Sequence, residues 1–423
     1  MREHLKLWIF FLLIILAIRF IIFFQSTDSF VNGEGISFRQ TLFTEPQVFS
    51  SYQLINARPS GFSPVKIIAP LEPKFHYGDT IAVSGIIGKK EPKNFGSFKN
   101  KLIINKKPDI IMYFPKIEAV GKSRLAFVYL IRQKIISLFG SVLPADSSAL
   151  LLGIVFGIKG NMSKEFLDNI RTVGVMHVIA ASGMNVSMAG GFLSSFFALF
   201  LRRQIALGLT VIAVLFYALL AGLEPSIMRA SIMGIMAFSA QILGRQRLAG
   251  YSLFMAGWLM LFVSPDLFLD VGFQLSFLAT LGLLYIRPFM ERGTGEKLIK
   301  SSVVGQEAAA TICAQIATLP ILLANFGTYS LWSVAANAVL LWTIPILMTL
   351  GGLAVVFGSL ISFLAQPFLY LAFPLLIYFE HVSRFFASLP GKITAVDFPI
   401  TFGLGYYLVL LSLILLLRSW RRE

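Results

Sequence analysis

The sequence predicts a polytopic α-helical membrane protein, with about ten spanning helices and a β-domain that lies outside the membrane. Of the 423 residues, 56% are hydrophobic and only 13% are charged, whereas a soluble domain carries about 25% charged residues. Apolar runs near the roughly 20 residues that cross a bilayer recur along most of the chain. Residues 25–144 differ, because they are rich in charge and in short alternating segments. A water-soluble globule is therefore excluded.

The first 24 residues predict a transmembrane helix. Leu5 to Phe24 form an apolar stretch that begins after Arg2 and also holds Lys6. This stretch is too long for the apolar core of a signal peptide, and no small-residue cleavage site follows it. We therefore expect an uncleaved helix over residues 1–24 whose charged start stays in the cytoplasm.

Residues 25–121 predict an extracytoplasmic OB-like β-barrel domain. Val, Ile, Phe and Thr alternate with polar residues between Gly, Pro and Asn punctuation, which is typical of short strands. Five short strands suit a small Greek-key barrel such as the OB-fold, whose strand face and loops bind extended polymers. The expected strands are Ile36–Phe43, Gln47–Ile55, Val65–Ala69, Thr80–Ile87 and Leu102–Phe114.

Three segments lead from this domain into the membrane. Residues 122–144 carry apolar residues at helical spacing, with Arg124, Arg132 and Lys134 set off from them, so we expect an amphipathic helix on the membrane surface. Ala145–Ile158 is apolar but too short to span, which indicates a re-entrant or buried segment. Ser163–Val173 is polar and suited to a helix. The apolar positions of the first segment are Leu125, Val128, Ile131, Ile135 and Phe139.

Residues 145–423 predict a multi-helix channel domain. With the N-terminus inside, the short cytoplasmic loops and ends collect most of the Lys and Arg outside the β-domain, whereas the short outer loops hold only Lys392. This positive-inside bias predicts a multi-pass protein of the inner (cytoplasmic) membrane with both termini in the cytoplasm and the β-domain outside. The expected spans after the first are 175–201, 205–222, 226–243, 249–263, 267–287, 302–324, 332–358, 366–389 and 402–418.

Polar side chains within the expected spans are candidates for lining a path. A charged residue costs about 2.5 kcal/mol or more at the bilayer centre, so such residues normally face the bundle interior or water. Glycine and proline accompany them, and interrupted helices are tolerated where they are buried or line a cavity. The alternative is structural pairing or packing near helix ends. The predicted lining residues are His177, Ser182, Asn185, Arg229, Gln274, Glu307, Gln315 and Asn337.

A lysine cluster in the β-domain is a candidate for binding DNA. Phe95 and Phe98 lie among the lysines, and only Glu91 opposes them in charge. Lysines that neutralise phosphates, beside aromatic rings that stack on bases, suit nucleic-acid binding without sequence preference. The same basic segment could bind anionic lipid headgroups. The cluster consists of Lys89, Lys90, Lys93, Lys99, Lys101, Lys106 and Lys107.

The sequence lacks the motifs of several enzyme classes. It has no phosphate loop of the G-x-x-x-x-G-K-[ST] type, so we expect no ATP hydrolysis. Its four histidines are scattered and it has one cysteine, Cys313, so we expect no metal site and no cofactor. An intramembrane serine hydrolase built on Ser182 and His381 is the least favoured alternative. We expect that the chain is not an enzyme.

Several motifs in the membrane part resemble the ComEC family of competence proteins, the inner-membrane channels for DNA uptake in bacterial transformation. They occur in the family's order over most of residues 145–390, and YGDTIAVSGII (77–87) is similar to the family's outer OB-like domain. The motifs are LLLGIVFG (150–157), HVIAASGMNV (177–186), RASIMG from Arg229, SPDLFLDVGFQLSFLAT (264–280) and ATLPILLANFGTYSLWSVAANAVLLWTIP (317–345).

The resemblance implies uptake of single-stranded DNA, an outer receptor for double-stranded DNA, a cytosolic ATPase or helicase, and a nuclease that acts as a separate protein. Asn185 departs from the family's usual histidine. The metallo-β-lactamase-like domain of longer members has no counterpart before Glu423, so nuclease activity is not expected of this chain. The sequence assigns no oligomeric state.

The sequence therefore favours a channel that takes up DNA through the cytoplasmic membrane, with DNA and membrane lipids as its partners. Two alternatives remain at this stage. One is a transporter of another anionic polymer or of a lipid-linked precursor. The other is an OB-type binding module whose helices serve only as an anchor.

Overall fold

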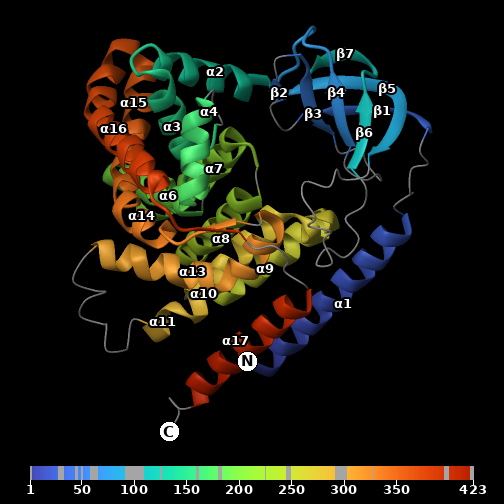
Figure 1. Ribbon diagram of the computed structural model, residues 1–423, viewed down its shortest axis with the longest axis vertical. Helices are drawn as coiled ribbons and strands as arrows, with labels where there is room; N and C mark the ends of the chain where they lie inside the picture. The colour runs from blue at the N-terminus through green and yellow to red at the C-terminus, as the bar shows by residue number, and fades with distance from the viewer. Residues whose placement is uncertain are drawn as a thin grey trace. The chain divides into compact units, whose positions relative to one another are not determined.

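A computed structural model describes most of the chain in two compact units (Figure 1). The first unit holds residues 1–99, 103–134 and 261–265, and the second holds 100–102, 135–260 and 266–423. The described residues are 2–26, 33–42, 46–48, 51–57, 65–90, 109–123, 126–158, 162–179, 183–223, 225–243, 249–290, 303–326, 328–394 and 400–419.

The first unit is built on a seven-stranded sheet. Its strand order is β1-β5-β6-β4-β3-β2, and β7 also pairs with β5. All recorded pairs are antiparallel except β4 with β6. The strands are β1 (Gly35–Thr41), β2 (Gln47–Val48), β3 (Gln53–Ala57), β4 (Val65–Ala69), β5 (Asp79–Lys90), β6 (Asp109–Tyr113) and β7 (Lys116–Lys122).

The long strand β5 organises this sheet. Its first half pairs with β1 on one side and β7 on the other, so that Ser84 lies between Ser37 and Lys116. Its last four residues pair instead with β6. Because side chains alternate across a strand, one face of β3, β4 and β5 forms the core, in which Ile67 and Ile81 are fully buried.

The strand predictions hold in part. Four of the five expected strands are present, although the expected strand 47–55 is split into β2 and β3. The sequence did not predict the strand β7. Only 109–114 of the fifth expected strand falls among the described residues, where β6 ends at Tyr113. The described pairings leave β1 and β2 as the two ends of the sheet order. A closed barrel therefore stays a prediction.

Two helices flank the sheet in the chain. Helix α1 (Arg2–Ser26) contains the predicted N-terminal span, and Nε of its Arg19 donates to the Phe262 carbonyl oxygen at 3.1 Å. Helix α2 (Ala126–Gly140) lies within the predicted amphipathic segment and buries Val128, Ile135 and Phe139.

The prediction that Arg132 is set off from the apolar positions of α2 is wrong. Arg132 is only 8% exposed, and its guanidinium carbon lies 5.6 Å from the centroid of the fully buried Tyr77 ring. An arginine can lie on an apolar face when an aromatic ring receives its charge and its stem packs. Burial raises the pKa of the Tyr77 phenol, and the Arg132 charge lowers it in part.

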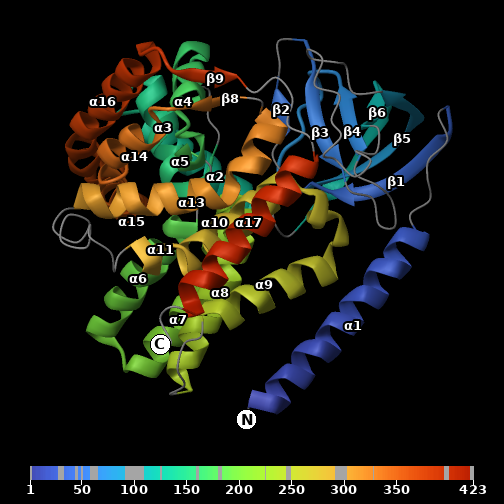
Figure 2. The same ribbon diagram turned by 60° about the horizontal axis from the view of Figure 1, so that its bottom comes forward.

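The remaining chain forms a helical bundle. Figures 1 and 2 both show α10 beside α13, and Figure 2 shows α6, α7 and α8 as neighbours. The helices are α3 (Ala145–Phe156), α4 (Lys164–Val173), α5 (Met176–Ile179), α6 (Gly183–Phe200), α7 (Arg203–Ala221), α8 (Pro225–Ile242), α9 (Ala249–Val263), η1 (Pro265–Leu269), α10 (Val271–Tyr285), α11 (Arg287–Met290), α13 (Val303–Phe326), α14 (Ser333–Leu340), α15 (Thr343–Leu360), η2 (Ser362–Ala365), α16 (Gln366–Ser388) and α17 (Ile400–Ser419). A two-stranded sheet pairs β8 (Thr328–Ser330) with β9 (Lys392–Thr394).

Seven described helical segments are long and apolar enough to span a membrane, where the sequence predicted about ten. The expected spans at 249–263 and 402–418 correspond to shorter apolar helices, and α8 does not meet the same criteria. The expected span 332–358 is interrupted and forms α14 and α15. The expected span 175–201 holds α5 and α6, and residues 180–182 between them lie outside the described residues. The chain is a polytopic helical membrane protein, with fewer clear spans than predicted.

Helix α3 confirms the prediction of a buried segment at 145–158. Every residue from Ser147 to Phe156 is buried. The helix packs against α15, where a methyl carbon on Gly351 would lie 2.7 Å from the Val155 side chain. A helix buried this completely must satisfy its last carbonyl groups within the protein, and this requirement shapes the site described next.

Candidate functional site

The site forms where α5 ends and α6 begins. These two helices belong to the HVIAASGMNV stretch, and the structure describes it on both sides of residues 180–182. From it, side chains and backbone reach α3 and α8. The predicted lining residue Ser182 lies outside the described residues.

Asn185, in the first turn of α6, binds the end of α3. It is 1% exposed, and its Nδ2 donates to the Ile154 carbonyl oxygen at 2.6 Å. Tyr217 of α7 donates in the same way to the Val155 carbonyl at 2.6 Å, and the left-handed Gly157 returns its N–H to the Gly153 carbonyl. Asn185 therefore acts as part of a cap that satisfies a buried helix end.

Arg229, in the second turn of α8, is the buried cation of the site. It is 8% exposed, Nη1 donates to the Ser276 carbonyl oxygen of α10 at 2.8 Å, and its guanidinium carbon lies 6.0 Å from the Phe277 ring centroid. A methyl carbon on Gly183 would lie 2.7 Å from Nη2. A side chain at the first residue of α6 would therefore force the guanidinium to shift. The buried Nε of Arg229 has no hydrogen-bond partner.

A second polar group joins α13 to α14. Gln315 of α13 donates from Nε2 to the Ser333 hydroxyl at 2.8 Å. One turn further along α14, Asn337 is 2% exposed, and its Oδ1 has no hydrogen-bond partner. The α4 cap Gly174 packs against Ser333, and the His177 side chain interacts with the Gly174 backbone.

The structure therefore brings His177, Gln315 and Asn337 into one polar neighbourhood and places Arg229 against the start of α6. Two further predicted lining residues, Gln274 and Glu307, lie apart from these contacts. Gln274 donates to the nearby Phe268 carbonyl at 2.9 Å, and the Glu307 carboxylate interacts electrostatically with Arg287. The sequence did not predict Ser276, Ser333 or Gly183 as site residues. The only signal for them was their position inside the same motifs.

Most of the predicted DNA-binding lysines cannot be placed. Lys93, Lys99, Lys101, Lys106 and Lys107 lie outside the described residues. Lys89 and Lys90 form the end of β5.

The described part of the β-sheet carries a shallow hollow of about 360 Å³ across β1, β5 and β7. Arg39, Lys116 and Glu118 border it, and Ala82 and Ser84 form its floor. Lys116 forms an ion pair with Glu118 at 2.9 Å. The sequence did not assign Arg39 or Lys116 to a site, because neither belongs to a cluster of basic residues.

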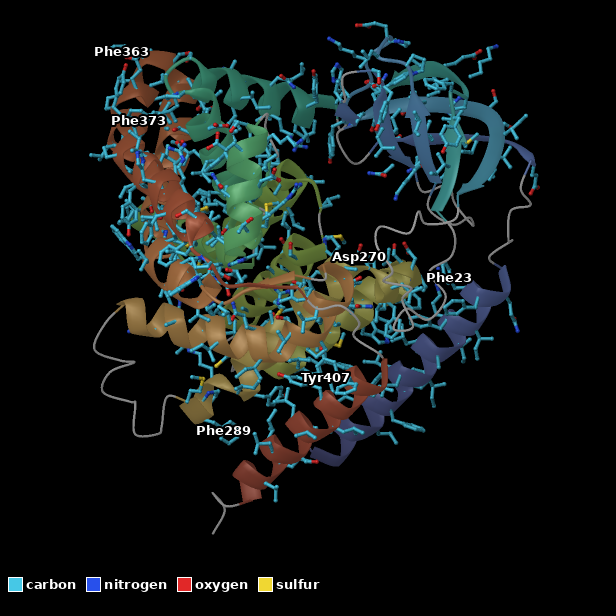
Figure 3. The ribbon with its side chains drawn as sticks, viewed as in Figure 1. Phe23, Asp270, Phe289, Phe363, Phe373 and Tyr407 are labelled. Atoms are coloured by element: carbon cyan, nitrogen blue, oxygen red, sulfur yellow. The ribbon has the colours of Figure 1, made fainter. Side chains whose placement is uncertain are left out.

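Hydrogen bonds outside these polar groups also connect and cap the bundle helices. Tyr406 and Tyr407 of α17 donate to the carbonyl oxygens of Ile316 and Ala317 at 2.7 and 3.1 Å, and Figure 3 shows Tyr407 on the α17 ribbon. Asp270, also labelled in Figure 3, begins α10 by accepting the Phe273 N–H at 2.8 Å. A carboxylate at this position caps the helix that supplies the acceptor for Arg229.

A polytopic helical bundle, with buried polar residues near the end of α5 and the start of α6, defines this chain as a multi-pass membrane protein. Comparison with known families identifies it further. The model of the competence protein family matches residues 154–420, which is more than half of the chain. The chain belongs to this family, the ComEC family of competence proteins.

Two relatives match parts of the chain. ComE operon protein 3 of Bacillus subtilis (strain 168) is 27% identical over 208 residues, which are 49% of this chain and 26% of that protein. An uncharacterized protein of Aquifex aeolicus (strain VF5) is 28% identical over 216 residues, 48% of this chain and 51% of that protein. The match thus spans about a quarter of one relative and about half of the other. No solved structure matches the chain.

Proposed function

We propose that this protein is a transmembrane channel for the uptake of DNA, in single-stranded form, across the cytoplasmic membrane during natural transformation. The observation that carries the proposal is the gathering of polar residues around the end of α5 and the start of α6 in a chain of the competence protein family. Buried polar groups on several helices are expensive in a bilayer unless they serve a pathway or pair with one another. Here two of them, Arg229 Nε and Asn337 Oδ1, keep unused hydrogen-bonding capacity.

The β-sheet unit is proposed as the receiving domain on the outer face, of OB type. Its lysine segment, which starts at Lys89, and the hollow beside Arg39 and Lys116 offer positive charge to a polyanion. The positive-inside pattern supports an extracytoplasmic position for this unit and cytoplasmic termini. An outer DNA receptor, a cytosolic ATPase and a separate nuclease remain proposed partners.

Uptake of labelled DNA tests the proposal directly. The protein would be expressed in a competent strain that lacks its own channel gene, and intracellular label would be counted. Gln315→Leu removes the bond to Ser333 at similar side-chain volume, so we expect uptake to fall at least tenfold. Gln241→Leu is the matched control. In the part of the chain that the structure describes, Gln241 donates to a carbonyl of its own helix, that of Ala237, so its replacement should leave uptake unchanged.

A second arm tests the receiving domain. Replacing all seven lysines between Lys89 and Lys107 with Gln should reduce both DNA binding and uptake, whereas replacing them with Arg keeps the charge and should preserve both. Normal uptake in the Gln variant and in Gln315→Leu would reject the channel. Binding of anionic liposomes but not DNA would instead favour a transporter of a lipid-linked precursor, and DNA binding with normal uptake in every membrane variant would favour an anchored binding module.

A further inference from the structure

Within the described residues, the buried positive charge of Arg229 has no counter-ion. Arg229 is 8% exposed, and it forms no ion pair with any residue in the described ranges. Its hydrogen bond to the Ser276 carbonyl oxygen goes to a neutral group. A buried charge is costly unless it is paired and fully hydrogen-bonded. The unused Nε–H therefore indicates that the site is incomplete without an anion.

The helix geometry around Arg229 favours an anion for a second, independent reason. Its Nη2 lies against Gly183, the first residue of the 18-residue helix α6. The N-terminus of a helix carries partial positive charge and outward-directed N–H groups, so it repels a cation and attracts an anion. Arg229 also lies near the start of its own helix, α8, which begins at Pro225. A guanidinium held at two helix N-termini is stabilised once a negative group lies between them.

We infer that Arg229 and the first turn of α6 form a binding site for a phosphate group inside the bundle. The guanidinium presents Nε–H and Nη2–H in the planar fork that matches two phosphate oxygens. The Ser276 carbonyl oxygen accepts from Nη1, the guanidinium carbon lies over the Phe277 ring, and both contacts hold the fork in position. N–H groups at the start of a helix can donate to the same phosphate.

This inference rests on the proposed function for the identity of its ligand. In a DNA channel, the phosphate is one phosphodiester of the passing strand. A single arginine neutralises one phosphate at a time, so the site orients the strand without holding many charges at once. The same chemistry could take a lipid phosphate headgroup or free phosphate, and the test separates these sources.

The test uses the purified full chain in uncharged detergent. Thermal unfolding would be followed at constant ionic strength while chloride is replaced by inorganic phosphate. Parallel series would add a thymidine dinucleotide, which has one phosphodiester and is too short to bridge the lysine segment, or phosphatidylglycerol in the micelles. A ligand that binds the folded state raises its melting temperature in proportion to ln(1 + [L]/Kd). We expect the dinucleotide to stabilise the protein more than phosphate or phosphatidylglycerol.

Paired variants locate the effect. Arg229→Gln removes the charge, and Gly183→Ala keeps the charge but displaces Nη2, so each should weaken binding of the dinucleotide about tenfold or more. The controls are Arg203→Gln, an exposed arginine at the start of α7, and Gly191→Ala, a position on α6 with open space for a methyl group. Both should bind like the unmodified protein.

The result also separates this inference from the proposed function. Unchanged phosphate-dependent stabilisation in Arg229→Gln, or none in the unmodified protein with any of the three probes, would overturn the site. The unmodified protein could bind the dinucleotide through Arg229 while deletion of the gene for this protein leaves DNA uptake intact in the native host. In that case the phosphate site stands and the channel function fails. Stronger stabilisation by phosphatidylglycerol than by the dinucleotide would assign the site to lipid instead of DNA.

Discussion

The Asn185 amide donates to the carbonyl oxygen of Ile154 across 2.6 Å, and this bond ties the start of α6 to the end of the buried helix α3. Asn185 occupies the position where the ComEC family resemblance led us to expect histidine. An imidazole N–H can donate to a carbonyl just as an amide N–H can. The departure from the family pattern is therefore compatible with one shared role, the capping of a helix end that water cannot reach.

We predict that Asn185→Leu destabilises the protein, because it leaves the Ile154 carbonyl buried without a donor. The expected loss is about 1–3 kcal/mol of unfolding free energy, measured by titrating the detergent-solubilised protein with a denaturing detergent. Asn185→His should retain most of the stability and most of the DNA uptake. Equal stability of the Leu and unmodified proteins would show that the bond to Ile154 contributes nothing.

The sequence predicted most of the helices but not this cap. Apolar length alone located the helices that begin at Arg203, Ala249 and Gln366, because a bilayer demands a continuous apolar run. The start of α6 at Gly183 was suggested only by the Ser182-Gly183 pair. Which carbonyl Asn185 would cap, or that Gly183 makes room for Arg229, depends on contacts between helices far apart in the chain, and residue patterns within one helix carry no such information.

A second prediction concerns Tyr406, whose hydroxyl donates to the Ile316 carbonyl. Pro320 lies inside α13 and has no N–H, so it cannot bond the carbonyl four residues earlier, which is that of Ile316. Tyr406 supplies the missing donor. Tyr406→Phe should therefore cost about 1–3 kcal/mol of unfolding free energy.

Tyr407→Phe is the matched control for this pair. Tyr407 donates to Ala317, whose carbonyl can also accept the N–H of Ile321 within α13. Its loss should cost less, about 0.5–1.5 kcal/mol. Equal or larger destabilisation by Tyr407→Phe, in the same detergent titration, would contradict the explanation through Pro320.

A third prediction concerns Tyr77 and Arg132 in the β-sheet unit. Burial raises the pKa of the Tyr77 phenol, and the Arg132 charge partly opposes that rise. Arg132→Met removes the opposing charge, so the pKa of Tyr77 should move further upward. An alkaline absorbance titration of each protein, minus that of its Tyr77→Phe counterpart, isolates this one phenol.

The sign of the stability effect follows from the same shift. Because the folded protein holds the phenolic proton more tightly, the stabilising contribution is complete below the unfolded pKa of about 10 and is lost as pH rises through the folded value. The loss should extend to higher pH in Arg132→Met, because only the folded pKa moves upward. Lys134→Met, at an exposed position on α2, should leave the Tyr77 titration unchanged, and a downward shift in Arg132→Met would refute the assignment.

The last prediction concerns the contact between α10 and α13, which carry the acceptor of Arg229 and the polar Gln315. A methyl group on Gly282 would lie 2.5 Å from the Cys313 carbonyl oxygen and 2.8 Å from the Ala317 side chain. Backbone cannot yield as a side-chain tip does, so Gly282→Ala must push the two helices apart at a cost of about 1–3 kcal/mol. Separation would move Ser276 and Gln315 relative to each other, and DNA uptake should therefore fall more than the amount of folded protein does. Gly208→Ala on α7 meets nothing within 4 Å and serves as the control. If uptake by Gly282→Ala merely follows the amount of folded protein, the spacing of these helices serves stability and does not set the geometry of the site.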